Sequence, residues 1–221
     1  MRFLEVCCTS FNDVFEAELG GSRRVELCSE LEIGGVTPPM EMVKEVIDGC
    51  PAMKVNVLVR PRGGDFVYSE DEILLMLESI EQCKALGVNA VVIGALLPDG
   101  NLDIDTMRRL IARARPMEVT FHRAFDECSE PLKALEEIIG LGCERLLTSG
   151  HEPDALTGRS LISELVAQAD GRIVIMAGGG VRPHNIVQIE RETGAPEFHS
   201  SSHGPDGLTS RAVVRQLCET S

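Results

Sequence analysis

Eight short apolar runs, most of them rich in valine and isoleucine, alternate with eight helix-like segments along this chain of 221 residues. Such alternation is typical of βα units around a parallel sheet, and eight units favour a closed (β/α)8 barrel, the TIM-barrel fold. No Pro/Gly/Ser-rich linker interrupts the series, so we expect residues 1–221 to form a single domain. A doubly wound open sheet is the main alternative. The even repeat and the lack of a G-x-G-x-x-G motif after the first run argue against it.

The expected strands are Phe3–Thr9, Arg24–Ser29, Val55–Arg60, Ala90–Gly94, Glu118–His122, Arg145–Ser149, Ile173–Ala177 and Glu197–Ser201. The expected helices are Asn12–Leu19, Pro39–Ile47, Ser69–Leu86, Asp105–Ala114, Pro131–Leu141, Leu156–Ala169, Arg182–Glu192 and Ser210–Cys218. Two local signals support these assignments. Ser69 and Glu72 fit a capping box, and Pro183 fits the first position of a helix.

The formal net charge of −14 argues against binding to nucleic acid or to an anionic membrane, because both would repel the chain at long range. No apolar stretch approaches the roughly 20 residues that a membrane span requires. The first residues, "MRFLEVCC", run directly into a strand pattern, without the pattern of an export signal. We therefore expect a cytoplasmic protein. The eight cysteines show neither C-x-x-C pairs nor zinc-ligand spacing, so we expect mostly reduced thiols.

Successive strand residues point to opposite faces, and here one of the two faces is unusually polar. The face expected to point into the barrel carries charged side chains from several strands, namely Glu5, Glu26, Arg60, His122 and Glu197. A buried charge must be paired or must serve a ligand, because leaving it unpaired costs several kcal/mol. We expect the three carboxylates to form an ionic cluster with Arg60 and His122. A salt-bridge network without a ligand is the alternative, and we favour a functional site.

Polar residues also gather where the expected strands end, at the rim where such barrels carry their sites. "VTFHRAFD" adds Arg123 and Asp126 to His122, and "RPRGGDF" places Arg62 near the mouth. "AGGGV" and "FHSSSHG" end the last two strands, and the loops at these positions commonly hold phosphate. We expect an anion site formed by residues from these segments, namely Arg62, Gly178, Gly179, Gly180, Ser200 and Ser201, with Arg123 as a further candidate.

Two thiols occupy matching places on consecutive expected strands. "LEVC" and "VELC" each place a carboxylate two residues before a cysteine, which puts Glu5 and Glu26 in one layer and Cys7 and Cys28 nearer the rim. Neighbouring strands lie about 4.8 Å apart, so the two sulfurs could share one ion. Two thiolates without a histidine partner suit Cu(I). Two reduced thiols that bind nothing are the alternative.

The motifs "RPRGGDFVYS", "VTFHRAFD", "LLTSG", "GGGV" and "FHSS", with the leading "EVC" and "VELC", resemble the CutC copper-homeostasis family over about residues 2–202. The resemblance implies a TIM barrel, a cytoplasmic location, a homodimer or homotetramer, and a role in copper handling. It also implies that Cys7 and Cys28 are the Cu(I) ligands. Family members usually carry a longer segment after "HSS". Here Ser202–Gly207 leads almost directly to the last helix.

Two functional hypotheses follow. The first is a cytoplasmic copper-homeostasis protein that binds Cu(I) through Cys7 and Cys28. The second is an enzyme of the isomerase or lyase type that acts on a small phosphorylated or carboxylated compound, without an organic cofactor. Its candidate catalytic residues are the acid–base groups Glu5, Glu26 and His122, the charge-stabilising Arg60 and Arg123, and Asp126. The partner is then a copper ion or a small anion.

Overall fold

The computed structural model describes residues 2–205 and 207–219, and it contains a closed barrel of eight parallel strands. The strands are β1 (Phe3–Cys8), β2 (Arg24–Leu27), β3 (Lys54–Leu58), β4 (Ala90–Ile93), β5 (Glu118–Phe121), β6 (Arg145–Thr148), β7 (Val174–Ala177) and β8 (Glu197–Ser200). They pair in chain order, and β1 closes the barrel by pairing with β8. The predicted (β/α)8 fold is confirmed, and each strand lies within two residues of its expected limits.

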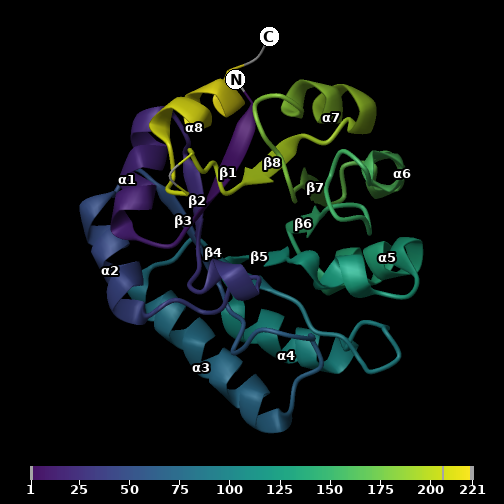
Figure 1. Cartoon of the computed structure of the whole chain (residues 1–221). Coiled ribbons are helices and arrows are strands. Elements are labelled where there is room, and N and C mark those ends of the chain that lie inside the picture. The colour runs from purple at the N-terminus through teal and green to yellow at the C-terminus, as the bar shows by residue number, and fades with distance from the viewer. Residues whose placement is uncertain (1, 206, 220–221) are drawn as a thin grey trace.

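In the described part of the chain, eight α-helices surround the strands in chain order (Figure 1). They are α1 (Phe11–Gly20), α2 (Met40–Gly49), α3 (Glu70–Leu86), α4 (Ile104–Ala114), α5 (Pro131–Leu141), α6 (Arg159–Ala169), α7 (Ile186–Thr193) and α8 (Arg211–Cys218). Two short 3-10 helices, η1 (Leu31–Ile33) and η2 (Arg123–Glu127), follow β2 and β5. None of the helices in the described residues is both long and apolar enough to cross a bilayer.

The local signals for helix starts were right at α3 and wrong at α7. Ser69 accepts a hydrogen bond from the backbone N–H of Glu72, and the Glu72 side chain accepts one from the backbone of Ser69, which completes the capping box. Pro183 lies in a turn instead, and α7 begins at Ile186 after Asn185. The triglycine after β7 is therefore separated from the helix, contrary to the sequence-based expectation.

The two faces of the strands differ as predicted. Side chains of the outward face pack against the helices and form the main apolar core, with Val6, Leu27 and Phe121 fully buried. The inward face contains a much smaller apolar cluster around Cys7 and Cys28, and its remaining positions are largely polar. The charged residues therefore lie at the centre of the barrel, where bulky aliphatic side chains are usual.

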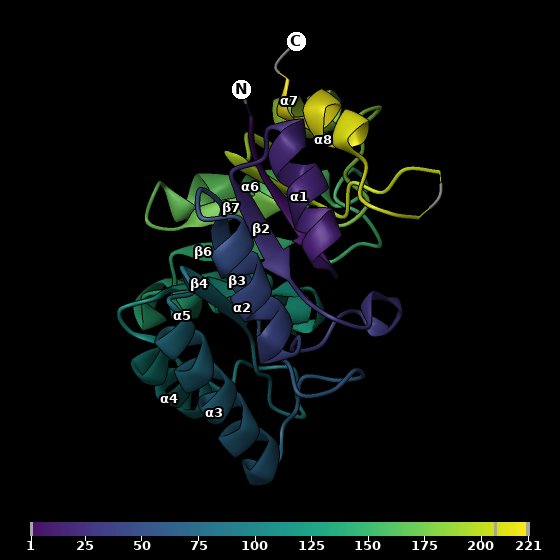
Figure 2. The ribbon, with the colours of Figure 1, turned by 90° about the vertical axis from the view of Figure 1, so that its left-hand side faces the viewer.

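The loops after the strands form one end of the barrel and carry the site. In Figure 2 the loop with η1 and the loop before α8 extend on the same side of the molecule. Of the segment Ser202–Gly207, the structure describes all but residue 206. Backbone hydrogen bonds from Ser210 N–H to Ser202 C=O and from Gly204 N–H to Leu208 C=O join the two sides of this loop before α8.

Candidate functional site

A buried arginine forms the floor of the site. Arg24 is 2 % exposed, and its Nε lies 2.6 Å from Glu5 Oε2. The same guanidinium contacts Glu197, which also pairs with Arg145 at 3.1 Å. The predicted ionic cluster exists, but its cation is Arg24 rather than Arg60 or His122. Arg24 has the same inward parity as Glu26 in the sequence, so this parity was the signal that could have identified it.

His199 connects this floor to the layer above it. Its Nδ1 lies 2.9 Å from Glu5 Oε1, and its Nε2 lies 3.2 Å from Glu26 Oε2. Burial disfavours the imidazolium, but the charges of Glu26 and Glu5 and the hydrogen bond to Glu5 outweigh it and raise the pKa of His199. The strand register explains this contact, because closure of the barrel pairs Glu5 with His199 on β8.

The two carboxyl groups beside His199 have opposite pKa shifts. Burial would raise the pKa of Glu5, but the hydrogen bond from His199 and the charge of Arg24 lower it to about 2. Glu26 forms no ion pair with an arginine among the described residues, so burial and the nearby charge of Glu5 raise its pKa to about 7, against the opposing effect of His199. Glu5 is therefore a fixed anion, whereas Glu26 can exchange a proton near neutral pH.

Cys7 and Cys28 meet beside this trio. Their sulfurs lie 3.3 Å apart and both side chains are buried. The strand register differs from the predicted layers, because Glu5 is level with Arg24 and Cys7 is level with Glu26. The hydrogen bond with Cys28 and burial both raise the pKa of the Cys7 thiol well above its usual value.

A histidine does accompany the thiols, contrary to the sequence-based argument. One donor atom from each of Cys7, Glu26 and His199 lies within 4.8 Å of the others. Cys28 Sγ lies 3.3 Å from Cys7 Sγ, so a second sulfur lies beside this group of one sulfur, one imidazole nitrogen and one carboxylate oxygen. Soft sulfur ligands suit Cu(I), and imidazole suits copper as well, so the donor set fits the expected ion.

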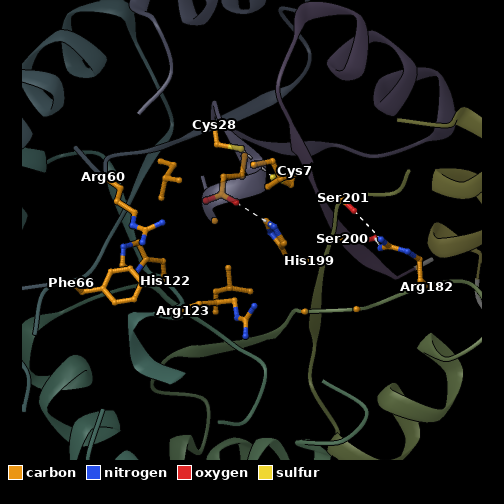
Figure 3. Close-up of a pocket in the computed structure, with 17 residues that line it drawn as sticks. Cys7, Cys28, Arg60, Phe66, His122, Arg123, Arg182, His199, Ser200 and Ser201 are labelled. Atoms are coloured by element: carbon orange, nitrogen blue, oxygen red, sulfur yellow. Dashed lines mark hydrogen bonds and ion pairs between the residues drawn. The ribbon is translucent and has the colours of Figure 1, made fainter. Parts of the chain in front are cut away.

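A cavity of about 320 Å³ opens above the thiols at the carboxyl end of the barrel (Figure 3). The predicted site residues that line it are Cys7, Glu26, Cys28, Arg60, His122, Arg123, Gly179, Gly180, Ser200 and Ser201. The predicted site residues outside its lining are Glu5, Arg62, Asp126 and Gly178. Leu31, Leu58 and Phe66 supply apolar parts of the wall.

Arg60 and His122 lie on one side of this cavity, next to Phe66 (Figure 3). The Arg60 guanidinium donates to the backbone carbonyls of Gly35 at 3.0 Å and Gly64 at 2.6 Å, and it stacks over the Phe66 ring. His122 Nδ1 accepts a hydrogen bond from the N–H of Ala124 at 3.1 Å. Burial and the charge of Arg60 lower the pKa of His122 to about 3, so this imidazole is neutral.

The candidates Asp126 and Arg62 have structural partners. Asp126 accepts hydrogen bonds from the N–H and hydroxyl of Ser149 and from the N–H of His151, which fastens η2 to the loop after β6. Arg123 pairs with Asp126 at 2.8 Å and still reaches the cavity wall. Arg62 pairs with Asp65 and with Glu72 and does not line the cavity. The structure therefore does not bring it together with the other residues of the expected anion site.

Arg182 takes the place that was expected for Arg62, and sequence reasoning missed it. Its guanidinium donates to the hydroxyl groups of Ser200 and Ser201, each at 3.1 Å, and it lines the cavity on the side opposite His122 (Figure 3). Gly178 packs under His199 instead of facing the cavity: a Cβ there would lie 3.1 Å from the Cβ of His199. Arg182 was assigned to a helix, and this assignment hid its role.

Comparison with known proteins identifies the family. A model of the CutC family matches residues 2–204. The chain belongs to the CutC family. A family protein CutC from Parabacteroides distasonis is 52 % identical over 201 residues, which are 91 % of this chain and 83 % of the relative. The human copper homeostasis protein cutC homolog is 46 % identical over 199 residues, which are 90 % of this chain and 72 % of the relative.

A solved CutC structure has the same fold. The crystal structure of a CutC protein from Streptococcus agalactiae matches this one with a TM-score of 0.87 at 32 % identity, over 91 % of this chain and 99 % of that chain. The CutC family match covers all eight strands and ends within Ser202–Gly207, the segment where the sequence was expected to depart from the family.

Proposed function

We propose that this CutC-family protein binds Cu(I) through Cys7 and Cys28 as part of copper homeostasis in the cytoplasm. The observation that carries the proposal is the pair of buried sulfurs 3.3 Å apart at the base of an accessible cavity. The copper-homeostasis name of the human relative supports the choice of ion. All eight cysteines are free thiols, which agrees with a reducing compartment.

The donor set supports a site with more than two ligands. Two thiolates would hold the copper ion as cargo, and His199 Nε2 would be available once its proton has left. Glu5 holds the other ring nitrogen of His199 at 2.9 Å and so orients the imidazole, as partners of metal-binding histidines commonly do. Glu26 lies beside the ion position and could take up a proton released from a thiol, because its pKa is about 7.

X-ray absorption at the copper edge tests the proposal directly. Protein loaded with one equivalent of Cu(I) under anaerobic conditions should show two sulfur neighbours and one nitrogen neighbour. His199→Gln should lose the nitrogen neighbour and keep both sulfurs. A spectrum with only nitrogen and oxygen neighbours would refute the assignment. Zn²⁺ also accepts sulfur and imidazole ligands, and preferential retention of zinc in a competition between the two ions would reassign the metal.

The second candidate function is acid–base catalysis, and the raised pKa of Glu26 favours it. A buried carboxyl that titrates near pH 7 suits proton transfer at neutral pH. Proton exchange is the simplest readout. Small carboxylates and phosphate esters incubated with the protein in deuterium oxide should gain deuterium at carbon, and Glu26→Gln should abolish this exchange.

The expected homodimer or homotetramer stays a prediction, which a sedimentation measurement would test.

A further inference from the structure

The cavity is larger than a copper ion requires. Its volume of about 320 Å³ lies at the lower end of the range of roughly 300–1,000 Å³ for pockets that hold small organic ligands. A bound ion at the thiols would fill only the end formed by Cys7 and Cys28. The rest of the space is enclosed by residues from the loops after the strands (Figure 3).

The lining of this space is suited to an anion. Three guanidinium groups line it, and Glu26 is the sole carboxylate among the described lining residues. Arg60 and Arg182 form no ion pair with any carboxylate in the described part of the chain, whereas most arginines of this protein do. Such a pocket attracts anions although the chain carries a net charge of −14. Arginines do not ligate a cation, so copper binding does not account for them.

His122 lines the same space and carries a buried hydrogen-bond donor that is not used. Its Nδ1 accepts from the N–H of Ala124, so the single proton of the neutral ring lies on Nε2. This Nε2 is buried and has no partner among the described residues, and the residue is 4 % exposed. A buried donor without a partner destabilises the folded protein. A ligand acceptor would satisfy it, and a metal ion would not.

The opposite side of the cavity has further free donors. Arg182 uses Nη1 and Nη2 on the carbonyl of Val181 and on two serine hydroxyls, so its Nε–H and one Nη2–H stay available. The Ser201 hydroxyl accepts from Arg182 and has no acceptor for its own proton among the described residues. This corner follows β7 and β8, where barrels of this fold commonly hold a phosphate.

We propose that the cavity binds a small organic molecule that carries a phosphate or carboxylate at one end, held by Arg182 and Ser201, and a hydrogen-bond acceptor at the other, held by His122 Nε2–H. Figure 3 shows these groups on opposite sides of the cavity, with Arg123 between them. The inference goes beyond copper binding and does not depend on it, because none of these donors is a metal ligand.

Calorimetry on metal-free protein tests the proposal, so a failure of copper binding leaves this test intact. The probes are phosphoglycolate, which has a phosphate and a carboxylate end, succinate, which has two carboxylate ends, and inorganic phosphate, which has one. At least one two-ended probe should bind at least tenfold more tightly than inorganic phosphate. Tighter binding of phosphoglycolate would identify the ligand's anionic end as a phosphate, and tighter binding of succinate would identify it as a carboxylate. If neither binds at millimolar concentration, or neither binds at least tenfold more tightly than inorganic phosphate, the proposal is wrong.

Two variants and one control locate the binding. Arg182→Gln should lower the affinity for the tighter-binding probe at least tenfold, and Ser201→Ala should lower it by a smaller factor. Arg191→Gln is the matched control, because Arg191 lies on α7 with a largely exposed side chain and should leave the affinity unchanged. The ring resonances of His122 should shift when the probe binds. Unchanged affinity in both variants, or an unshifted His122, would overturn the proposed contacts.

Discussion

His199 Nδ1 lies 2.9 Å from Glu5 Oε1, and this contact joins the buried charges of the barrel to its two thiols. Glu5 is held in turn by Arg24, whose guanidinium also contacts Glu197 at the far end of β8 from the cavity. The chain Glu197–Arg24–Glu5–His199 therefore fixes the imidazole from below and leaves its other nitrogen beside Glu26. The polar interior is a support for the site, which explains why the barrel carries charges where apolar packing is usual.

Removal of the central cation should destabilise the fold strongly. Arg24→Met leaves Glu5 and Glu197 buried without this partner, and breaking a buried ion pair from one side typically costs about 3–5 kcal/mol. We expect a loss of that size in the free energy of unfolding, measured with urea. Arg109→Met is the control, because Arg109 and Glu70 form an exposed pair, and such pairs contribute little to stability. Equal losses in the two variants would contradict the supporting role of Arg24.

His122 should make the fold less stable in acid. Its pKa is about 3 in the folded protein and about 6.5 in the unfolded chain, so between these values the unfolded chain binds the extra proton. Stability contributed by the neutral ring is present above pH 6.5 and is lost as the pH falls, by up to about 1.4 kcal/mol per pH unit. His122→Asn should flatten this part of the stability profile measured from pH 7 to pH 4. A variant with an equally steep profile would show that the ring is not buried as a neutral group.

Copper affinity should rise with pH. The thiols must lose protons before they bind the ion, and hydrogen bonding and burial keep the pKa of Cys7 well above its usual value. Each proton displaced per ion increases the apparent affinity up to tenfold per pH unit. Competition with a Cu(I) chelator at pH 6, 7 and 8 measures this dependence. A constant affinity across the series would mean that ion binding releases no net proton to the solvent, which would contradict this prediction.

Substitution by alanine at two glycines should change the stability of the fold in opposite directions. Gly158 lies against the loop after β6, where a Cβ would fall 1.9 Å from the carbonyl oxygen of Ser149, so Gly158→Ala should cost roughly 2 kcal/mol or more. Gly140 lies within α5 with no atom near its Cβ position, so Gly140→Ala should stabilise by about 0.5–1 kcal/mol. Thermal unfolding of both variants checks this. A destabilised Gly140→Ala would contradict the open space at that helix surface.

The barrel and its polar interior could be predicted because both depend on periodicity. Side chains alternate between the two faces of a strand, so Glu5, Cys7 and His199 could be assigned to the inward face without knowledge of the exact strand limits. The eightfold repeat of strand and helix indicates a closed barrel. Partners across the barrel could not be predicted in the same way. They depend on the stagger between neighbouring strands, which placed Cys7 level with Glu26 and Glu5 level with Arg24.

Loop residues were the least predictable part of the site. Arg62 and Arg182 both follow strands, but Arg62 turns to nearby carboxylates, whereas Arg182 turns to Ser200 and Ser201. The direction of such long side chains depends on local pairing that periodicity does not encode. The start of α7 at Ile186 instead of Arg182 also depended on the loop path after the glycines.

Anaerobic titration with Cu(I) against a coloured chelator tests the central claim most directly. The wild type should bind about one Cu(I) per chain, and Cys7→Ala with Cys28→Ala should abolish this binding. Cys83→Ala with Cys143→Ala is the matched control, because both thiols are buried outside the barrel interior, and it should bind like the wild type. Equal Cu(I) binding by the Cys7/Cys28 double variant and the wild type would contradict the assignment of these two thiols.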